Sequence, residues 1–244
     1  MPPQPTVALF VTCLVDQIYP HIGVATLRLL RRAGYHVDFP LGQTCCGQPF
    51  ANSGYQPQAI QLAHHTITTL EPYPAVVLPS GSCTTMLRHH YPQLLAADSA
   101  WHDRAQALAA KTFELTEFLT TRSALPAVTS PHTTPVTYHD SCHMCRTLRL
   151  RQPPRTTLHH INAPLHEHPE SDRCCGFGGL FSTKMPDVAA AMTHAKQNAI
   201  PHPNNQPATL VTADPGCLLQ FQRHTPPDQP QPRHIAELLE EATR

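Results

Sequence analysis

Nine cysteines carry the clearest chemical signal in this sequence, because their spacing repeats along the chain. They are Cys13, Cys45, Cys46, Cys83, Cys142, Cys145, Cys174, Cys175 and Cys217. Adding 129 to the positions of the first three gives Cys142, Cys174 and Cys175, and Cys83 corresponds to Cys217 at an offset of 134. Both vicinal pairs continue as Cys-Cys-Gly. These shared offsets predict a duplicated chain in which each copy carries four cysteines.

Four thiolates in each half match the usual ligand set of a 4Fe–4S cluster. Structural zinc, which also takes four thiolates, is the main alternative, followed by a vicinal disulfide and by ordinary buried thiols. Adjacent cysteines disfavour zinc, because two neighbouring side chains on one ion close a small, strained ring. On a larger inorganic core they can reach different irons. The pattern therefore predicts one iron–sulfur cluster in each half, held by the eight repeated cysteines.

Glycines follow both vicinal pairs and gather after the second one. Gly47 and Gly176 come directly after the pairs, and Gly178 and Gly179 complete a glycine-rich turn. Glycine allows backbone conformations closed to other residues and lets the chain approach an inorganic core. We expect these four glycines to contribute to cofactor binding, with backbone amides donating to cluster sulfurs. A tight turn with no cofactor contact is the alternative.

Cys145 lies outside the repeat, since the corresponding position in the first half is Asp16. Together with Cys142 it forms a Cys-x-x-Cys motif, which could give the second cluster a fifth thiolate. The preferred interpretation is a small apolar side chain on the first turn of a helix.

Alternating strand and helix patterns predict an α/β fold with parallel sheets. In the first half, apolar runs predict strands over 7–11 and 35–39 and before Pro79, and helices over 19–33, over 58–70 and after Cys83. The first of these helices carries Ile22, Thr26, Leu29 and Leu30 on one face, with Gly34 suited to its C-terminal cap.

The second half repeats this order of elements. Strands are expected over 135–139 and 209–213, with helices over 155–161 and from Pro186 onward. The apolar face of the last helix is expected to be Val188, Met192, Ala195 and Ala199. The result is two pseudo-symmetric halves, each a small parallel sheet flanked by helices with cysteines at the carboxyl ends of strands, where open α/β sheets place ligands.

Three regions follow from this reading of the chain. Residues 1–98 form the first cysteine-rich domain, 99–134 a connecting segment, and 135–244 the second domain. The connecting segment contains a helix or strand over 112–119 and a linker rich in Pro, Ser and Thr from 125 onward.

Composition narrows the possible partners and the compartment. Lys and Arg together number 17 and so do Asp and Glu, and no basic stripe is present, so we expect no nucleic-acid partner. No apolar run approaches the roughly 20 residues of a membrane-spanning helix, and no signal peptide opens the chain. We expect a cytoplasmic protein, in which reduced thiols serve metal or redox chemistry rather than disulfides.

Five segments of the chain resemble the cysteine-rich CCG family. They are Phe-Val-Thr-Cys-Leu-Val-Asp at 10–16, Gln-Thr-Cys-Cys-Gly-Gln-Pro at 43–49, Tyr-His-Asp-Ser-Cys-His at 138–143, Cys-Cys-Gly-Phe-Gly-Gly at 174–179 and Asp-Pro-Gly-Cys at 214–217. The family includes the B subunit of heterodisulfide reductase, iron–sulfur subunits of glycolate oxidase, and lactate utilisation proteins. The likeness to the lactate utilisation branch is the greatest, and it extends over nearly the whole chain.

The resemblance implies an iron–sulfur electron-transfer subunit in a complex that oxidises L-lactate, or a related 2-hydroxy acid, to pyruvate. Its implied partners are iron–sulfur subunits resembling lactate utilisation proteins B and C. The alternative is a catalytic protein of the heterodisulfide reductase type that reduces a disulfide or a quinone. The chain has no Gly-x-Gly-x-x-Gly fingerprint, so we expect no bound NAD or FAD.

The chain departs from the family pattern three residues before the last cysteine of each half. Some members carry a further cysteine there, whereas this chain has Ser80 and Asp214. This departure indicates ordinary four-thiolate sites, or an oxygen ligand from Asp214.

Two polar side chains beside Cys142 are candidates for a catalytic role. If a 2-hydroxy acid binds at this edge, Arg146 could pair with its carboxylate and His143 could take its hydroxyl proton. The alternative is a helix N-terminus with solvated charges.

Overall fold

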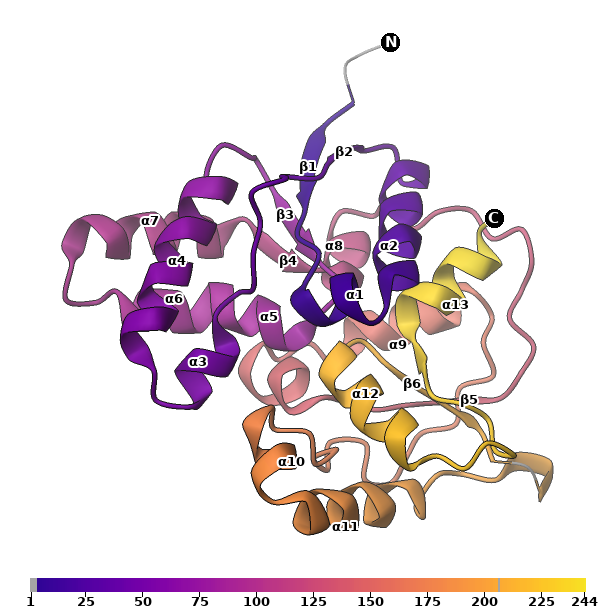
Figure 1. The fold of residues 1–244 in the computed structure, drawn as a ribbon. Coiled ribbons are helices and arrows are strands. Elements are labelled where there is room, and N and C mark those ends of the chain that lie inside the picture. Colours follow the sequence, from indigo (N-terminus) through magenta and orange to yellow (C-terminus); the bar gives the residue numbers. More distant parts are fainter. Residues whose placement is uncertain (1–3, 206) are drawn as a thin grey trace. The chain divides into compact units, whose positions relative to one another are not determined.

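Two parallel sheets organise the protein, one in each half of the chain (Figure 1). The computed structural model describes residues 4–205 and 207–244. The chain divides into two compact units, Met1–Ala124 and Leu125–Arg244. The predicted α/β fold with duplicated halves is confirmed.

The first unit has a four-stranded sheet in the order β2-β1-β3-β4, with every pair parallel. Its strands are β1 (Thr6–Leu9), β2 (His36–Asp38), β3 (Val76–Leu78) and β4 (Thr112–Glu114). Its helices are α1 (Cys13–Gln17), α2 (Pro20–Arg32), α3 (Gln48–Asn52), α4 (Gln56–Leu70), α5 (Gly81–Thr85), η1 (Met86–His90), α6 (Tyr91–Leu94), α7 (Ser99–Ala110) and α8 (Leu115–Thr121). Helices α4, α6 and α7 pack together beside this sheet, and Figure 1 shows α2 on its other side.

The second unit has a three-stranded parallel sheet in the order β5-β6-β7. Its strands are β5 (Val136–Tyr138), β6 (Thr209–Thr212) and β7 (Arg233–His234). Its helices are η2 (His143–Thr147), α9 (Gln152–His160), α10 (Leu180–Lys184), α11 (Pro186–Gln197), η3 (Pro203–Asn205), α12 (Pro215–His224) and α13 (Ile235–Ala242). Helix α11 packs against α12, and α9 packs against α13. Among the described residues, no helix has both the length and the apolar character needed to cross a bilayer.

The duplication extends beyond the cysteines to the order of the sheets. Strand β1 corresponds to β5, β3 to β6 and β4 to β7. The counterpart of β2 is reduced to a single parallel bridge between Val136 and Leu165. Helices α8 and α13 also correspond, and both begin with a capping box, at Glu114 and His234.

The segment expected to connect the halves is divided between the units. Up to Ala124 it lies in the first unit, where β4 pairs with β3 and α7 packs against α4 and α6. The part from Leu125 onward belongs to the second unit, where Thr129 N–H donates to the Ala242 carbonyl at 2.9 Å. The stretch over 112–119, expected as a helix or a strand, contains parts of both, because β4 ends at Glu114 and α8 begins at Leu115.

Helix α2 buries the face that its sequence predicts. Ile22, Thr26, Leu29 and Leu30 are all fully buried. Gly34 follows the helix with φ +89°, and its N–H donates to the Arg31 carbonyl at 3.0 Å. The left-handed conformation of this glycine ends the helix, as expected.

The predicted buried face of α11 is wrong by about one residue. Val188 is 46% exposed, whereas Ala189, Thr193 and Lys196 are buried. Thr193 Oγ1 donates to the Cys175 carbonyl at 2.8 Å, so this helix presents small and hydrogen-bonding side chains to the cysteine turn. Contact with that turn decides which face is buried, and apolar periodicity alone does not reveal it.

Glu114, the N-cap of α8, predicts a specific pH dependence of stability. Burial raises its pKa from 4.5 to about 8, against the opposing hydrogen bonds from Thr116 and Glu117. Below pH 4.5 the carboxyl is protonated whether the chain is folded or not; above it, only the unfolded chain ionises until the pH approaches 8. The contribution of Glu114 therefore falls as pH rises through this window, by at most about 5 kcal/mol.

Glu114→Gln should remove that slope while keeping the cap, because an amide oxygen can accept the 2.7 Å bond from Thr116 N–H. Denaturant unfolding of both proteins between pH 5 and 8.5 measures the difference, in which contributions from other groups cancel. Parallel pH profiles for the two proteins would contradict the assignment of a protonated Glu114.

Candidate metal centres

The four repeated cysteines of the first unit all follow carboxyl ends of strands. Cys13 opens α1 after β1, the pair Cys45 and Cys46 lies between β2 and α3, and Cys83 lies in the first turn of α5 after β3. Parallel strands end at one edge of their sheet, so the topology brings together residues that are up to 70 positions apart.

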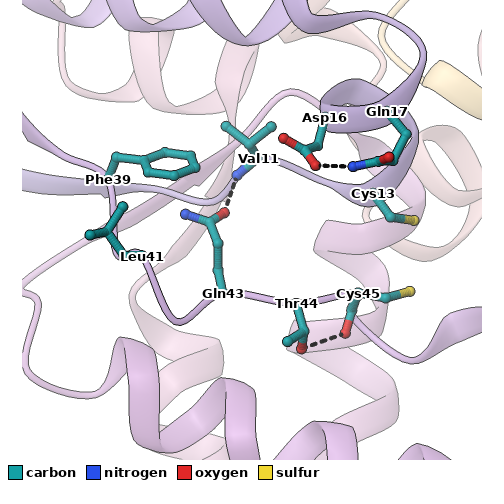
Figure 2. A pocket seen from close by; sticks show the side chains of 9 residues that line it. All are labelled: Val11, Cys13, Asp16, Gln17, Phe39, Leu41, Gln43, Thr44 and Cys45. Carbon is teal, nitrogen blue, oxygen red and sulfur yellow. Dashed lines mark hydrogen bonds between the residues drawn. The ribbon is translucent and has the colours of Figure 1, made fainter.

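Hydrogen bonds link the four sulfurs of the first unit. Cys46 Sγ donates to Cys83 Sγ at 3.3 Å, and Cys13 and Cys46 both hydrogen-bond to Cys45. Figure 2 shows the sulfurs of Cys13 and Cys45 pointing to the same side. The Gly47 N–H donates to Cys45 Sγ at 3.5 Å.

Because the thiols lie so close together, their pKa values shift in opposite directions. Hydrogen bonds from Cys13 and Cys46, with the Gly47 amide, lower the pKa of Cys45 to about 3. The bond to Cys45 and then burial raise the pKa of Cys13, and bonds to Cys45 and Cys83 raise that of Cys46. Four thiolates cannot share this space without a cation, so metal binding must displace protons.

The second unit repeats the arrangement around a tighter pair. Cys175 Sγ donates to Cys217 Sγ at 3.0 Å, and Cys217 lies in the first turn of α12. The bond from Cys175 lowers the pKa of Cys217, but burial and nearby Asp214 raise it to about 11. Cys142 lies farther out, at the N-cap of η2, and burial followed by the charge of Cys174 raises its pKa.

Backbone amides of the second cysteine turn donate to sulfur. Gly176 N–H donates to Cys174 Sγ at 3.5 Å, and Phe177 N–H donates to Cys175 Sγ at 3.4 Å. Gly178 and Gly179 turn the chain into α10, with φ +50° and φ +61°. Phe177 lies within the glycine-rich turn whose backbone amides were expected to donate, and this donation does not depend on its side chain.

Gly176 is the glycine that the structure constrains most. Its φ is +90°, and a Cβ atom there would lie 2.4 Å from the Ala189 carbonyl oxygen of α11. Gly176→Ala should therefore cost clearly more stability than Gly34→Ala, which meets open space at φ +89° and should cost about 1–2 kcal/mol. Denaturant unfolding and iron content measure the two effects, and equal costs would show that the approach to α11 is not tight.

Cys145 and Asp214 both have structural partners. Cys145 Sγ donates to the Asp140 carbonyl at 3.8 Å. Burial raises the pKa of this thiol, and the charged groups that also act on it are arginines and aspartates rather than cysteines. Asp214 caps α12, since its Oδ1 accepts from Gly216 N–H at 3.1 Å. Ser80 caps α5 in the same way by accepting from Cys83 N–H at 3.3 Å. Helix capping explains why both departures from cysteine are tolerated at these positions.

The two catalytic candidates both follow Cys142 in the chain. His143 Nδ1 lies 3.7 Å from Cys142 Sγ, and Arg146 Nη2 donates to the Asp172 carbonyl at 2.9 Å. Arg146 is exposed, and its charge opposes the raised pKa of Cys142 and of Cys174. The arrangement places a cation beside the cysteines, and the catalytic role stays a prediction.

Two buried polar residues of the second unit were not predicted from the sequence. His139 and Lys196 are fully buried, and Lys196 Nζ donates to the carbonyls of Glu170 at 2.7 Å and Ser171 at 2.8 Å. Burial lowers the pKa of Lys196 to about 8, while Cys217 and Cys175 oppose that shift. The offset of 129 places Phe10 and Ile67 at these positions in the first half. Comparing the two halves position by position would have found both residues.

A pocket of about 340 Å³ opens beside Cys13 and Cys45 (Figure 2). Its lining residues are Val11, Cys13, Asp16, Gln17, Phe39, Leu41, Gln43, Thr44 and Cys45. Gln43 fixes one wall, because its Oε1 accepts from Val11 N–H at 2.6 Å and its Nε2 donates to the Pro40 carbonyl at 3.0 Å. These lining residues include no Lys, Arg or His, and their acidic groups are Asp16 and the low-pKa thiol of Cys45.

The donor sets fit metal bound through thiolates. Each unit brings four cysteines to one sheet edge, and the backbone amides of Gly47, Gly176 and Phe177 donate to three of their sulfurs. Such donors fit the thiolate ligation of iron–sulfur clusters. Among the described residues, the group of three donor atoms within 4.8 Å of one another is His139 with Cys175 and Cys217.

The family model of the cysteine-rich domain, CCG, matches residues 7–88 and 136–222, one stretch in each unit. The chain belongs to the cysteine-rich CCG family. Both matched stretches contain all four repeated cysteines of their unit, so the CCG domain is present twice, as the duplication requires.

Relatives of this CCG protein include three proteins named Lactate utilization protein A. The one from Bacillus pumilus (strain SAFR-032) is 43% identical over 236 residues, which cover 96% of this chain and 98% of the relative. The one from Exiguobacterium sp. (strain ATCC BAA-1283 / AT1b) is 42% identical over 247 residues, covering 99% of each. The one from Bacillus subtilis (strain 168) is 44% identical over 216 residues, covering 88% and 90%.

Proposed function

We propose that the protein is an iron–sulfur electron-transfer subunit of a cytoplasmic complex that oxidises L-lactate, or a related 2-hydroxy acid, to pyruvate. The observation that carries this proposal is the pair of matching four-cysteine sets at the sheet edges of two CCG domains. The name Lactate utilization protein A, borne by relatives over nearly their whole length, supports the substrate.

We assign one 4Fe–4S cluster to each unit. The ligands in the first unit are Cys13, Cys45, Cys46 and Cys83, and those in the second are Cys142, Cys174, Cys175 and Cys217. When bound, such clusters supply reversible one-electron exchange. The chain contributes the amide donors at Gly47, Gly176 and Phe177, the buried sulfur pairs, and the nearby cation of Arg146.

The pocket beside Cys13 argues against direct binding of lactate there. A carboxylate ligand requires a cation or several donors, whereas the lining has no cationic side chain and contains the acidic groups of Asp16 and Cys45. Oxidation of lactate to pyruvate releases two electrons and two protons, which the proposal assigns to a site on partner subunits. These partners would be iron–sulfur proteins resembling lactate utilisation proteins B and C.

Anaerobic purification with iron and sulfide analysis and electron paramagnetic resonance (EPR) tests the cofactor. The expected result is about eight irons and eight sulfides per chain. The isolated chain should not turn over lactate, and the complex with its partners should. Protein that binds no iron or acid-labile sulfide, even after reconstitution, would contradict the proposal.

The same pocket keeps a second function open, because its uncharged walls at Phe39 and Leu41 suit a neutral substrate next to Cys13 and Cys45. A catalytic CCG protein of the heterodisulfide reductase type would reduce a disulfide or a quinone there. Turnover of such substrates by the isolated, cluster-loaded chain distinguishes this function from electron transfer.

A further inference from the structure

His139 is a buried polar side chain whose ring nitrogens make no close hydrogen bond. It directly follows β5, and its backbone N–H donates to the Val211 carbonyl of β6 at 2.8 Å. The side chain is 0% exposed, and neither Nδ1 nor Nε2 has a hydrogen-bond partner. A buried polar group left unsatisfied costs about 1–3 kcal/mol, so a histidine kept here needs a function for its nitrogens.

The ring of His139 lies at the sulfurs of the second unit. One of its nitrogens and the Sγ atoms of Cys175 and Cys217 all lie within 4.8 Å of one another. Two donor–metal bonds of 2.0–2.3 Å span up to about 4.6 Å, so these donors are near the reach of one metal ion. Phe221 packs edge-on against the ring, with 4.9 Å between centroids, and limits its orientation.

The Ser171 carbonyl is the polar group beside the ring, but it is already occupied. Its oxygen accepts from Asp140 N–H at 2.9 Å and from Lys196 Nζ at 2.8 Å. A ring nitrogen without a close hydrogen bond has a lone pair available to a metal, and imidazole is a common metal ligand.

The first unit shows that packing does not require a histidine at this position. Phe10, 129 residues earlier, is fully buried in a core cluster that includes Cys46 and Cys83. An aromatic hydrocarbon therefore fills the corresponding space beside the corresponding cysteine pair. The nitrogens of His139 are the difference between the two units.

We propose that His139 supplies a nitrogen ligand to the metal centre that Cys175 and Cys217 hold, so that the second centre has mixed thiolate and imidazole ligation while the first has thiolates alone. This inference rests on the proposed iron–sulfur cofactor. A four-iron cluster takes one terminal ligand on each iron, so the nitrogen of His139 would take the place of one of the four cysteines assigned above. Imidazole in place of thiolate raises the reduction potential of such centres, and the buried cation of Lys196 acts in the same direction. The duplicated halves would thus hold centres of unequal potential.

Pulsed EPR on the full chain tests the ligand directly. The sample is the Cys45→Ser protein, which keeps the second centre, prepared with either ¹⁴N- or ¹⁵N-histidine, reconstituted anaerobically and reduced with dithionite to the paramagnetic state. We expect a strong nitrogen coupling that changes with the isotope. It should be lost in His139→Phe, which copies the first unit, and kept in His143→Ala, which alters the other histidine near a cysteine.

A second measurement does not depend on the phenylalanine variant folding. His139→Cys replaces imidazole with thiolate and should shift the reduction potential of the second centre downward. An assembled second centre with no nitrogen coupling, or only the weak coupling of a hydrogen-bonded N–H, would overturn the inference and leave the proposed cofactor in place. Failure of any cluster to assemble would instead count against the proposed function.

Discussion

Cys45→Ser should reduce the iron bound per chain by about half and leave the centre of the second unit intact. Cys174→Ser should do the converse. The two donor sets belong to separate compact units, each with its own sheet. In Cys45→Ser the first unit should lose nearly all of its iron, because Cys45 accepts hydrogen bonds from two neighbouring thiols and is the sulfur that ionises most readily. Iron and sulfide analysis with EPR of each purified variant measures the outcome.

Cys145→Ser is the matched control for these variants. Cys145 is also buried in the second unit, but its thiol donates to the carbonyls of Asp140 and Cys142 and to no other cysteine. Its substitution should leave the iron content unchanged. Loss of iron in Cys145→Ser would make it a ligand, and loss of both centres in Cys45→Ser would contradict the independence of the two units.

The convergence of the four cysteines of each unit at one sheet edge was predictable from sequence, because it depends on spacing. Parallel strands end at one edge, so a cysteine placed after Leu9, Asp38 and Leu78 must meet the others there. The buried face of α2 was predictable from apolar periodicity, since its one buried hydroxyl, Thr26, donates within the helix to the Ile22 carbonyl at 2.8 Å.

Sequence reasoning failed where tertiary contacts outweigh the local pattern. The face of α11 follows from the bond of Thr193 to the Cys175 carbonyl, which apolar periodicity does not encode. His139 was read as the end of a strand, and its place beside Cys175 and Cys217 depends on how the vicinal pair folds back. Residues 99–124 belong to the first unit and 125–134 to the second, and this assignment depends on β4 pairing with β3, a contact between distant segments.

Arg155→Met should destabilise the second unit by about 3–5 kcal/mol, because it leaves a buried carboxylate without its counter-ion. Asp140 is 0% exposed, and Arg155 binds it through two bonds, Nη1 to Oδ1 at 3.0 Å and Nη2 to Oδ2 at 2.9 Å. Arg151 lies 3.8 Å from the same carboxylate but is itself half exposed and bonded to Asp172, so it is a poor substitute.

The matched control is Arg104→Met, which removes a similar paired arginine at the surface of the first unit. Both members of the Arg104–Glu71 pair are more than a third exposed, so solvent screens their attraction. The loss there should be at most about 1 kcal/mol. Denaturant unfolding of both variants, followed by a probe in each unit, measures the contrast.

The effect of Arg155→Met should extend to the metal centre, because Asp140 lies between His139 and Cys142 along the chain. A carboxylate that moves toward solvent would displace the segment that carries Cys142, so iron loading of the second unit should fall with its stability. Adding Asp140→Asn to Arg155→Met removes the unpaired charge and should restore much of both. If the double variant were as unstable as the single one, the cost would lie in lost packing of Arg155 rather than in an uncompensated buried charge.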